Sequence, residues 1–181
     1  SIVTDKNNNV YTVGLFRGTV DFDPGTAVFN LTSIGEKDAF ICKLDKNGNF
    51  IWAKQYGDSA SIDEHSSLGI DALGNLYTTN SFVGKVDLDP GSSSFYLTSL
   101  GWGRDIFIQK LDNNGNFIWA KQISDQPSSG PAPTHSNAIT VDANGKVEHV
   151  KIKESSNSIF DKEALRKTVE SFHKVKASMK A

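Results

Sequence analysis

The side chains best placed to do chemistry are two pairs of aspartates, each followed by a Pro-Gly step. The pairs are Asp21 with Asp23 and Asp87 with Asp89. In an extended strand, residues two apart point to the same side, so each pair aims two carboxylates at one region. Hard oxygen ligands of this kind suit Ca²⁺, while the competing interpretation is a polar entry to a Pro-Gly turn. Calcium is therefore the one cofactor that the sequence brings into consideration.

No catalytic or cofactor-binding residue can be assigned. The single cysteine, Cys42, has no identifiable base to activate it as a nucleophile. The four histidines lack metal-ligand spacing such as His-x-x-x-His; they are His65, His135, His149 and His173. We therefore predict that the chain is not an enzyme. A hydrolase that uses its acids for acid–base work is the weakest alternative.

Composition limits the classes of protein to consider. The chain has 181 residues, 38% of them hydrophobic and 22% charged, as in an ordinary soluble globular protein. The net charge of −2 gives no reason to expect a nucleic-acid partner. No apolar run approaches the roughly 20 residues that span a bilayer. The charge is uneven, with a negative excess in residues 1–142 and a positive excess in 143–181, which indicates two segments with different surroundings.

The chain repeats itself. The heptapeptide Asn-Phe-Ile-Trp-Ala-Lys-Gln stands at 49–55 and again at 116–122. The motif Val-Asp-x-Asp-Pro-Gly begins at Val20 and again at Val86. A third copy opens near Ile139 but lacks the later motifs. Internal repetition of this kind is typical of folds in which similar units stack on one another.

Each copy predicts short antiparallel strands. Asn-Gly turns join apolar, β-favouring runs, because Asn and Gly tolerate the positive φ angles of a tight hairpin. One small sheet cannot cover both of its apolar faces, so neighbouring sheets must stack. In the first copy we expect strands near 2–4, 10–16, 39–44 and 50–56, and a shorter excursion near 19–32. The side chains expected between sheets are Phe40, Ile41, Phe50, Ile51 and Trp52, with their copies Phe107, Ile108, Phe117, Ile118 and Trp119.

Two spaced patterns carry a family resemblance. Ser-x-x-x-Asp-x-x-Gly-Asn-x-Tyr, followed by Asp-x-Phe-Ile-x-Lys-Leu-Asp-x-x-Gly-Asn-x-x-Trp, resembles the bacterial seven-bladed β-propeller repeat family over residues 1–147. The Val-Asp-x-Asp-Pro-Gly insertion resembles versions in exported Bacteroidetes-like proteins. The resemblance implies a mainly β fold of antiparallel four-stranded blades, here a partial β-propeller. It also implies a non-catalytic protein, extracellular or on the surface of a bacterium, and names no ligand.

The tail differs from the repeats. From Asp161 onward, apolar residues recur at the three- and four-residue spacing of an amphipathic helix, so we expect a C-terminal α-helix. The stretch 141–165 resembles the C-terminal domain of TonB-type energy transducers, in which a hairpin precedes a helix. That resemblance implies a periplasmic protein-interaction element. We divide the chain into a first blade repeat (1–66), a second (67–126), a linker with the start of a third (127–147), and the tail (148–181).

Two groups of residues are candidates for partner binding. Trp102 and Arg104 lie in a loop insertion of the second copy, and an exposed aromatic beside an arginine is typical of interface hot spots. The alternative is that the Trp102 ring folds back over a sheet edge. The apolar stripe of the tail, Leu165, Val169 and Phe172, is the second group.

From these features we expect a scaffold or binding module for a protein or glycan partner, which could form a homo-oligomer through its blades or its C-terminal helix. The alternative is the periplasmic TonB-type element carried by the tail.

Overall fold

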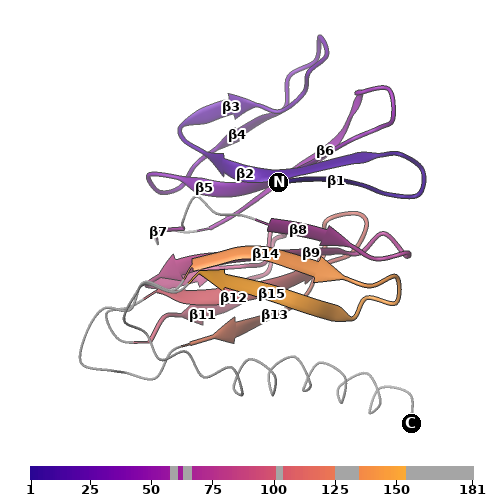
Figure 1. Ribbon diagram of the computed structural model, residues 1–181. Helices are drawn as coiled ribbons and strands as arrows, with labels where there is room; N and C mark the ends of the chain where they lie inside the picture. The colour runs from indigo at the N-terminus through magenta and orange to yellow at the C-terminus, as the bar shows by residue number, and fades with distance from the viewer. Residues whose placement is uncertain (58–60, 63–66, 101–103, 125–134, 154–181) are drawn as a thin grey trace.

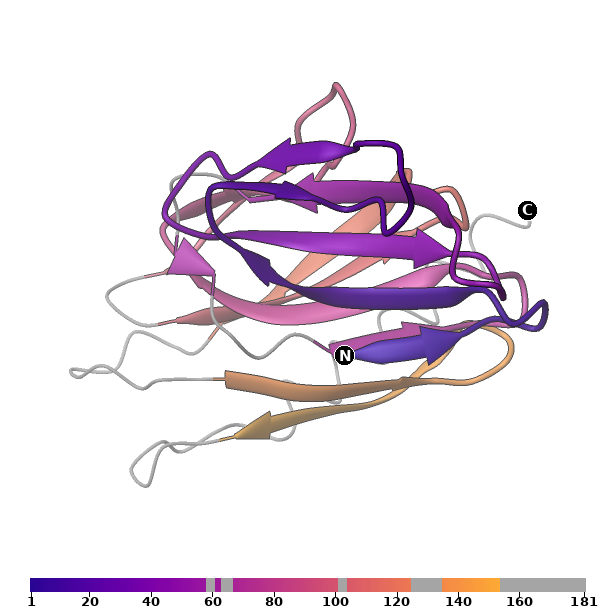
Figure 2. The same ribbon diagram turned by 90° about the horizontal axis from the view of Figure 1, so that it is seen from above.

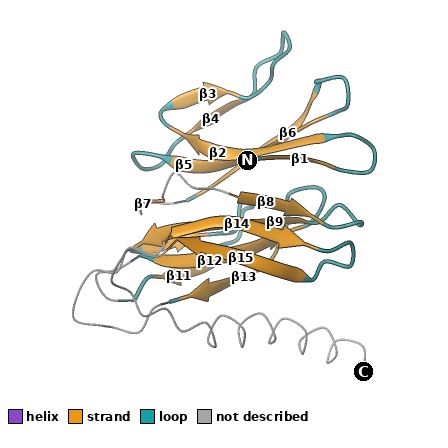
Figure 3. Cartoon of the chain, in the orientation of Figure 1, coloured by secondary structure: helices purple, strands orange, loops and turns teal. Residues whose placement is uncertain are grey.

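The computed structural model describes residues 1–57, 61–62, 67–100, 104–124 and 135–153, and its regular secondary structure is all β-strand (Figures 1 and 3). Alternating apolar residues and Asp/Asn/Gly turns favour this outcome along the whole repeat. The strands are β1 (Ile2–Thr4), β2 (Val10–Phe16), β3 (Thr19–Asp21), β4 (Asn30–Thr32), β5 (Asp38–Leu44), β6 (Phe50–Tyr56), β7 (Ser61–Ile62), β8 (Ser67–Ile70), β9 (Leu76–Val83), β10 (Lys85–Asp87), β11 (Tyr96–Thr98), β12 (Asp105–Leu111), β13 (Phe117–Ile123), β14 (His135–Val141) and β15 (Val147–Lys153).

The two copies of the repeat build the same antiparallel sheet. The first sheet has the order β1-β2-β5-β6, which confirms the four strands predicted from the sequence. The second sheet has the order β8-β9-β12-β13, and β7 also pairs with β9. The registers match: Phe16 pairs with Asp38 in one copy, as Phe82 pairs with Asp105 in the other. Similar sequences therefore take up similar shapes.

Each excursion forms a separate hairpin. Strands β3 and β4 pair only with each other, as do β10 and β11. A glutamine on the outer strand fastens each hairpin to its sheet: the Gln55 side-chain amide donates to the Thr32 carbonyl at 3.0 Å, and that of Gln122 to the Thr98 carbonyl at 2.8 Å. The third copy is a two-stranded hairpin, β14-β15.

These sheets stack to make the core (Figures 1 and 2). One buried cluster joins the two large sheets, with Tyr11, Ile41 and Tyr56 from the first meeting Phe82 and Phe107 from the second. A second cluster joins the second sheet to the β14-β15 hairpin; it contains Tyr77, Ile106, Ile108, Ile123, Ile139, Val147 and Val150. Stacking of repeated sheets is thus what removes their apolar faces from water.

The predicted intersheet residues divide into two groups. Trp52 and Trp119 pack against the two buried clusters, as the stacking hypothesis required. The prediction was wrong for Ile51 and Ile118, whose side chains are 43% and 46% exposed. Both lie on the outermost strand of their sheet and point to the face opposite that of the adjacent tryptophan.

The predicted fold class needs correction. We expected four-stranded propeller blades and a C-terminal α-helix, whereas the described residues contain no helix and form several small antiparallel sheets. The excursions add independent two-stranded sheets because their ends are closed by turns and pair locally. The residues of the predicted helix, Leu165, Val169 and Phe172 among them, lie outside the described part of the chain. Within that part no helix is long and apolar enough to cross a membrane.

Candidate functional site

A five-residue aspartate turn links the first two strands of each repeat. Asp5 accepts hydrogen bonds at Oδ1 from the backbone N–H groups of Asn7 and Asn9, at 2.8 and 2.9 Å. Its Oδ2 accepts from the Asn9 side chain at 2.9 Å. Asp71 makes the same bonds to Leu73 and Asn75. One carboxylate therefore closes each turn by satisfying donors that would otherwise face solvent.

A tyrosine and a lysine extend each of the first two turns. The Tyr11 hydroxyl donates to Asp5 Oδ2 at 3.1 Å, and the Tyr77 hydroxyl lies 3.2 Å from Asp71 Oδ2. The Lys43 ammonium sits 4.9 Å above the Tyr11 ring, and Lys110 repeats this over Tyr77. Burial, followed by the nearby carboxylate, raises the pKa of both tyrosines, so each hydroxyl stays protonated as a donor.

The turns of the second and third repeats are joined. The Ala72 N–H donates to the Ala143 carbonyl at 3.1 Å, and the Tyr77 hydroxyl lies 3.0 Å from the Gly145 carbonyl. Gly145 has a φ of 77°, and a β-carbon at this position would collide with Tyr77 and Asp71. Glycine is therefore required both by the backbone angle and by the close approach of the neighbouring turn.

Between the first and second repeats the turns stay apart and leave a groove of about 460 Å³. Lys6 and Ala72 both line it, and no backbone hydrogen bond joins them as one joins Ala72 to Ala143 in the next pair of turns. The Lys43 ammonium donates to the Asn113 carbonyl at 3.3 Å at the edge of the groove. Leu73 stands on the wall with 78% of its surface exposed. The remaining lining comes from Thr4, Asp5, Asn7, Asn9, Ile70, Asp71, Gly74 and Ala143.

The groove combines an exposed aliphatic side chain, lysines and amides. The carboxylates of Asp5 and Asp71 already accept four hydrogen bonds each from their own turns and tyrosines. They are positioning groups, held in place and fully occupied. The arrangement suits contact with a polypeptide surface better than proton transfer.

The aspartate turns make the stability of the fold depend on pH in the acid range. Side-chain and backbone hydrogen bonds from Asn49 lower the pKa of Asp45 below its ordinary 3.8, and for Asp5 and Asp112 similar bonds outweigh the opposing effect of burial. A carboxyl group whose pKa is lower in the folded than in the unfolded chain stabilises the fold at pH values above its unfolded-state pKa. This stabilisation is lost as the pH falls through the folded-state pKa.

We therefore expect the urea midpoint of unfolding to be insensitive to these groups near neutrality and to fall below about pH 4. Asp45→Asn, which cannot titrate, should show a shallower fall over the acid range. A parent chain whose steepest loss comes above pH 5 would contradict this assignment.

The four predicted metal-site aspartates turn toward the backbone. Asp21 Oδ1 accepts from the N–H groups of Asp23 and Phe29, at 3.0 and 2.8 Å, and Asp87 Oδ1 does the same for Asp89 and Phe95. Asp23 and Asp89 each accept from the glycine two residues on. Among the described residues no three His, Cys, Asp or Glu side chains gather in a metal-binding arrangement. Here the carboxylates shape the hairpin loop, and calcium binding stays a prediction.

The other candidates are scattered. Arg104 is partly buried and directly precedes β12, and Trp102 lies outside the described residues. Cys42 is buried, with Sγ 4.0 Å from the Phe22 carbonyl, and burial with the nearby Asp23 charge raises the pKa of its thiol to about 11. A neutral thiol is a poor nucleophile, in keeping with a packing role.

The sequence prediction missed the groove. The sequence shows only that the turn recurs: the pattern Asp-x-x-x-Asn or its variant stands at 5–9, 71–75 and 142–146. We interpreted each copy as a hairpin turn, which is correct locally. Their gathering at one end of the stack follows from the packing of the sheets.

Comparison with protein-family profiles finds no match. The chain is similar to an uncharacterised WD repeat-containing protein of Acanthamoeba polyphaga mimivirus, with 32% identity over 96 residues. The alignment covers 45% of this chain and 7% of that protein. The similarity fits a propeller-like repeat in general and does not single out the bacterial repeat family.

Proposed function

We propose that this chain is a non-catalytic protein-interaction scaffold and that the groove between its first two aspartate turns binds a segment of the partner. The observation that carries the proposal is the contrast between two equivalent junctions in one molecule. The second junction is closed by the Ala72–Ala143 and Tyr77–Gly145 contacts, while the first is open. Turns of this kind can therefore close the space between two repeats, and at the first junction that space stays open to a ligand.

The lining supports a polypeptide ligand. Leu73 is an exposed aliphatic anchor, and Ile70 and Ala72 extend the apolar wall beside it. Lys43 and Asn113 supply donors and acceptors at the edge. An apolar centre with a polar rim is the ordinary composition of a protein-binding surface. Similarity to a WD repeat-containing protein supports the same class of function.

Four finer expectations also belong to the proposal. We keep the extracellular or bacterial cell-surface location, which the family resemblance implies, and a glycan as the other ligand class. Calcium binding by Asp21, Asp23, Asp87 and Asp89 would stiffen the outer hairpins. The TonB-type alternative depends on the tail, which lies outside the described residues.

The test uses a displayed library of random peptides selected against the immobilised full chain. Enriched peptides should bind the parent in fluorescence anisotropy and bind Leu73→Asp at least about tenfold more weakly, because a charge replaces the anchor. Ile118→Asp is the matched control, since Ile118 is also an exposed aliphatic residue but lies on an outer strand. The Ile118→Asp variant should bind the selected peptides with the same affinity as the parent.

Two results would overturn the proposal. One is equal binding of the selected peptides to the parent and both variants, which would place the site elsewhere. The other is a failure to enrich any peptide together with binding on a glycan array that Leu73→Asp abolishes. That result would assign the groove to a carbohydrate.

A further inference from the structure

Each repeat sheet has two different faces. We call the first the tyrosine face; it carries Tyr11, Ile41 and Tyr56 in the first sheet and Tyr77, Ile108 and Ile123 in the second. We call the second the phenylalanine face; it carries Phe16, Phe22 and Phe40 in the first copy and Phe82, Leu88 and Phe107 in the second. In both junctions of the molecule, a tyrosine face covers the next repeat.

The phenylalanine face of the second copy is fully covered. Tyr56 from the first sheet lies edge-on to Phe107, with ring centroids 6.1 Å apart. The Gly57 N–H donates across the junction to the carbonyl of Asp87 at 3.1 Å. As a result the side chains of Val86, Leu88, Phe107 and Leu111 are all 0% exposed.

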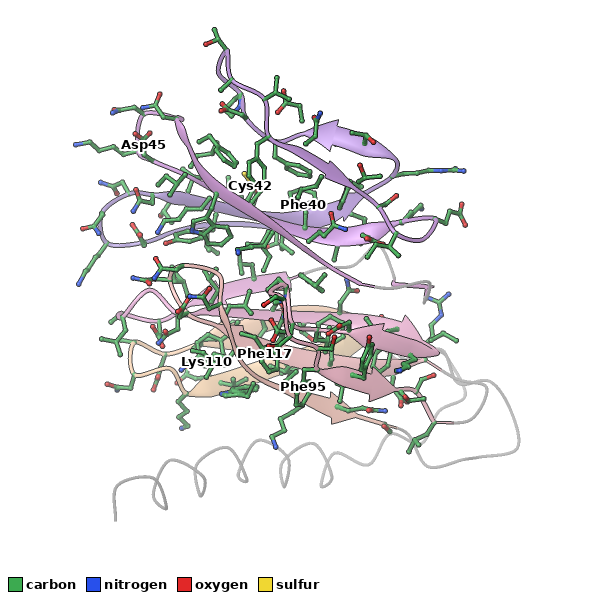
Figure 4. The ribbon with its side chains drawn as sticks, turned by 180° about the vertical axis from the view of Figure 1, so that it is seen from behind. Phe40, Cys42, Asp45, Phe95, Lys110 and Phe117 are labelled. Atoms are coloured by element: carbon green, nitrogen blue, oxygen red, sulfur yellow. The ribbon has the colours of Figure 1, made fainter. Side chains whose placement is uncertain are left out.

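The same face of the first copy is less completely covered: Phe22 packs over Phe16 and Phe40, but no neighbouring sheet lies against it among the described residues. Its counterparts Val20, Phe22, Phe40 and Leu44 are all partly exposed, although their strands pair in the same register. Phe40 and Cys42 lie on the side of the first sheet that faces away from the second (Figure 4). The difference in exposure thus comes from the missing neighbour, since the sequences and the backbone pairing are alike.

The uncovered face is also the more apolar of the two. In the second copy Gln109 accepts a hydrogen bond from Thr78 at 2.9 Å and donates to the Leu88 carbonyl. In the first copy Cys42 takes the place of Gln109, and Gly14 that of the buried Asn80. A surface of this composition calls for an apolar occupant.

We propose that the phenylalanine face of the first copy is the docking surface for a further repeat of the same kind, which lies before Ser1 in the same polypeptide and contributes its tyrosine face. Chain direction supports this choice, because at both junctions the covering repeat precedes the covered one. The similar mimivirus protein supports it too, since 7% of that protein matches this chain and WD repeats occur in it.

A second copy of this chain is a poorer occupant. Within the described residues the tyrosine face of the first sheet is covered by the second sheet, and that of the second sheet by the β14-β15 hairpin. A second copy would have to separate one of these junctions before it could offer such a face.

The test adds a repeat to the full chain and measures protection of a single cysteine. A copy of residues 1–66, with its own cysteine replaced by alanine, is fused directly before Ser1, so that the 66-residue spacing between repeats is kept. The parent part carries Val20→Cys with Cys42→Ala. We expect the added repeat to slow maleimide labelling at position 20 by at least about tenfold, because the counterpart Val86 is fully buried.

Two controls make the result specific. Val28→Cys should label at the parent rate with or without the added repeat, since Val28 is 69% exposed and its counterpart Ser94 is exposed beside a neighbouring sheet. An added repeat carrying Tyr11→Asp and Ile41→Asp should give no protection at position 20. Unchanged labelling with the intact repeat would overturn the proposal. Protection of the unfused chain that increases with its concentration would also overturn it, in favour of a second copy.

Discussion

Replacing Phe107 with alanine should lower the free energy of unfolding by about 3–5 kcal/mol, the range for removal of a fully buried phenylalanine. Phe107 is 0% exposed at the junction of the two large sheets and touches the rings of Tyr56 and Phe82. The truncation leaves a cavity that neither sheet can fill without losing its strand pairing. Urea denaturation, with the slope m checked for constancy, gives the value.

Phe40→Ala is the matched control, because Phe40 occupies the same place in the first copy. It is partly exposed and contacts chiefly Phe22 and Phe16, with ring centroids 4.8 and 6.3 Å away. We expect a loss of about 1–2 kcal/mol, since less surface returns to water and solvent can enter the space. Equal losses for the two variants would show that cover by the first sheet is not what makes Phe107 critical.

The strands could be predicted from the sequence because their causes are local. Asp45 with Asn49 closes a turn within five residues, and alternation sets which flanking side chains face inward. The stacking of sheets could also be foreseen, since Phe107 and Ile108 on adjacent positions require cover on both faces. Repetition made these predictions stronger by showing the same pattern twice.

The groove could not be foreseen, because it depends on how two sheets are placed against each other. Ala72 meets Ala143 in one junction, while Lys6 stays apart from Ala72 in the other, and nothing within a single turn distinguishes these outcomes. Local pattern failed for Ile51 for the same reason. Its aliphatic side chain indicated burial, but its place on the outer strand of the sheet leaves it exposed. Distances between segments far apart in the chain come from tertiary packing rather than local pattern.

Asp71→Ala should be the second most damaging substitution, with a loss of about 3 kcal/mol in the free energy of unfolding. The Asp71 carboxylate is buried and accepts hydrogen bonds from Leu73, Asn75 and Tyr77, and the Lys110 ammonium lies 3.9 Å away. Its removal takes the acceptor from the part-buried amides of Leu73 and Asn75 and leaves the Tyr77 hydroxyl with the Gly145 carbonyl, and donors left unpaired cost more than the bonds themselves contributed. Thermal and urea unfolding of the full chain measure the loss.

Asp112→Ala provides the comparison within the same sheet. Asp112 closes the same kind of turn through Asn114 and Asn116, but these donors are exposed and can bond to water. We expect a loss of about 1 kcal/mol. Because Asp71 also supports Tyr77 against Gly145, Asp71→Ala should in addition speed hydrogen exchange of the Ala72 amide, which bonds to the third repeat. If Asp112→Ala proved as costly as Asp71→Ala, turn closure alone would explain both, and the contact between the second and third repeats would not contribute to stability.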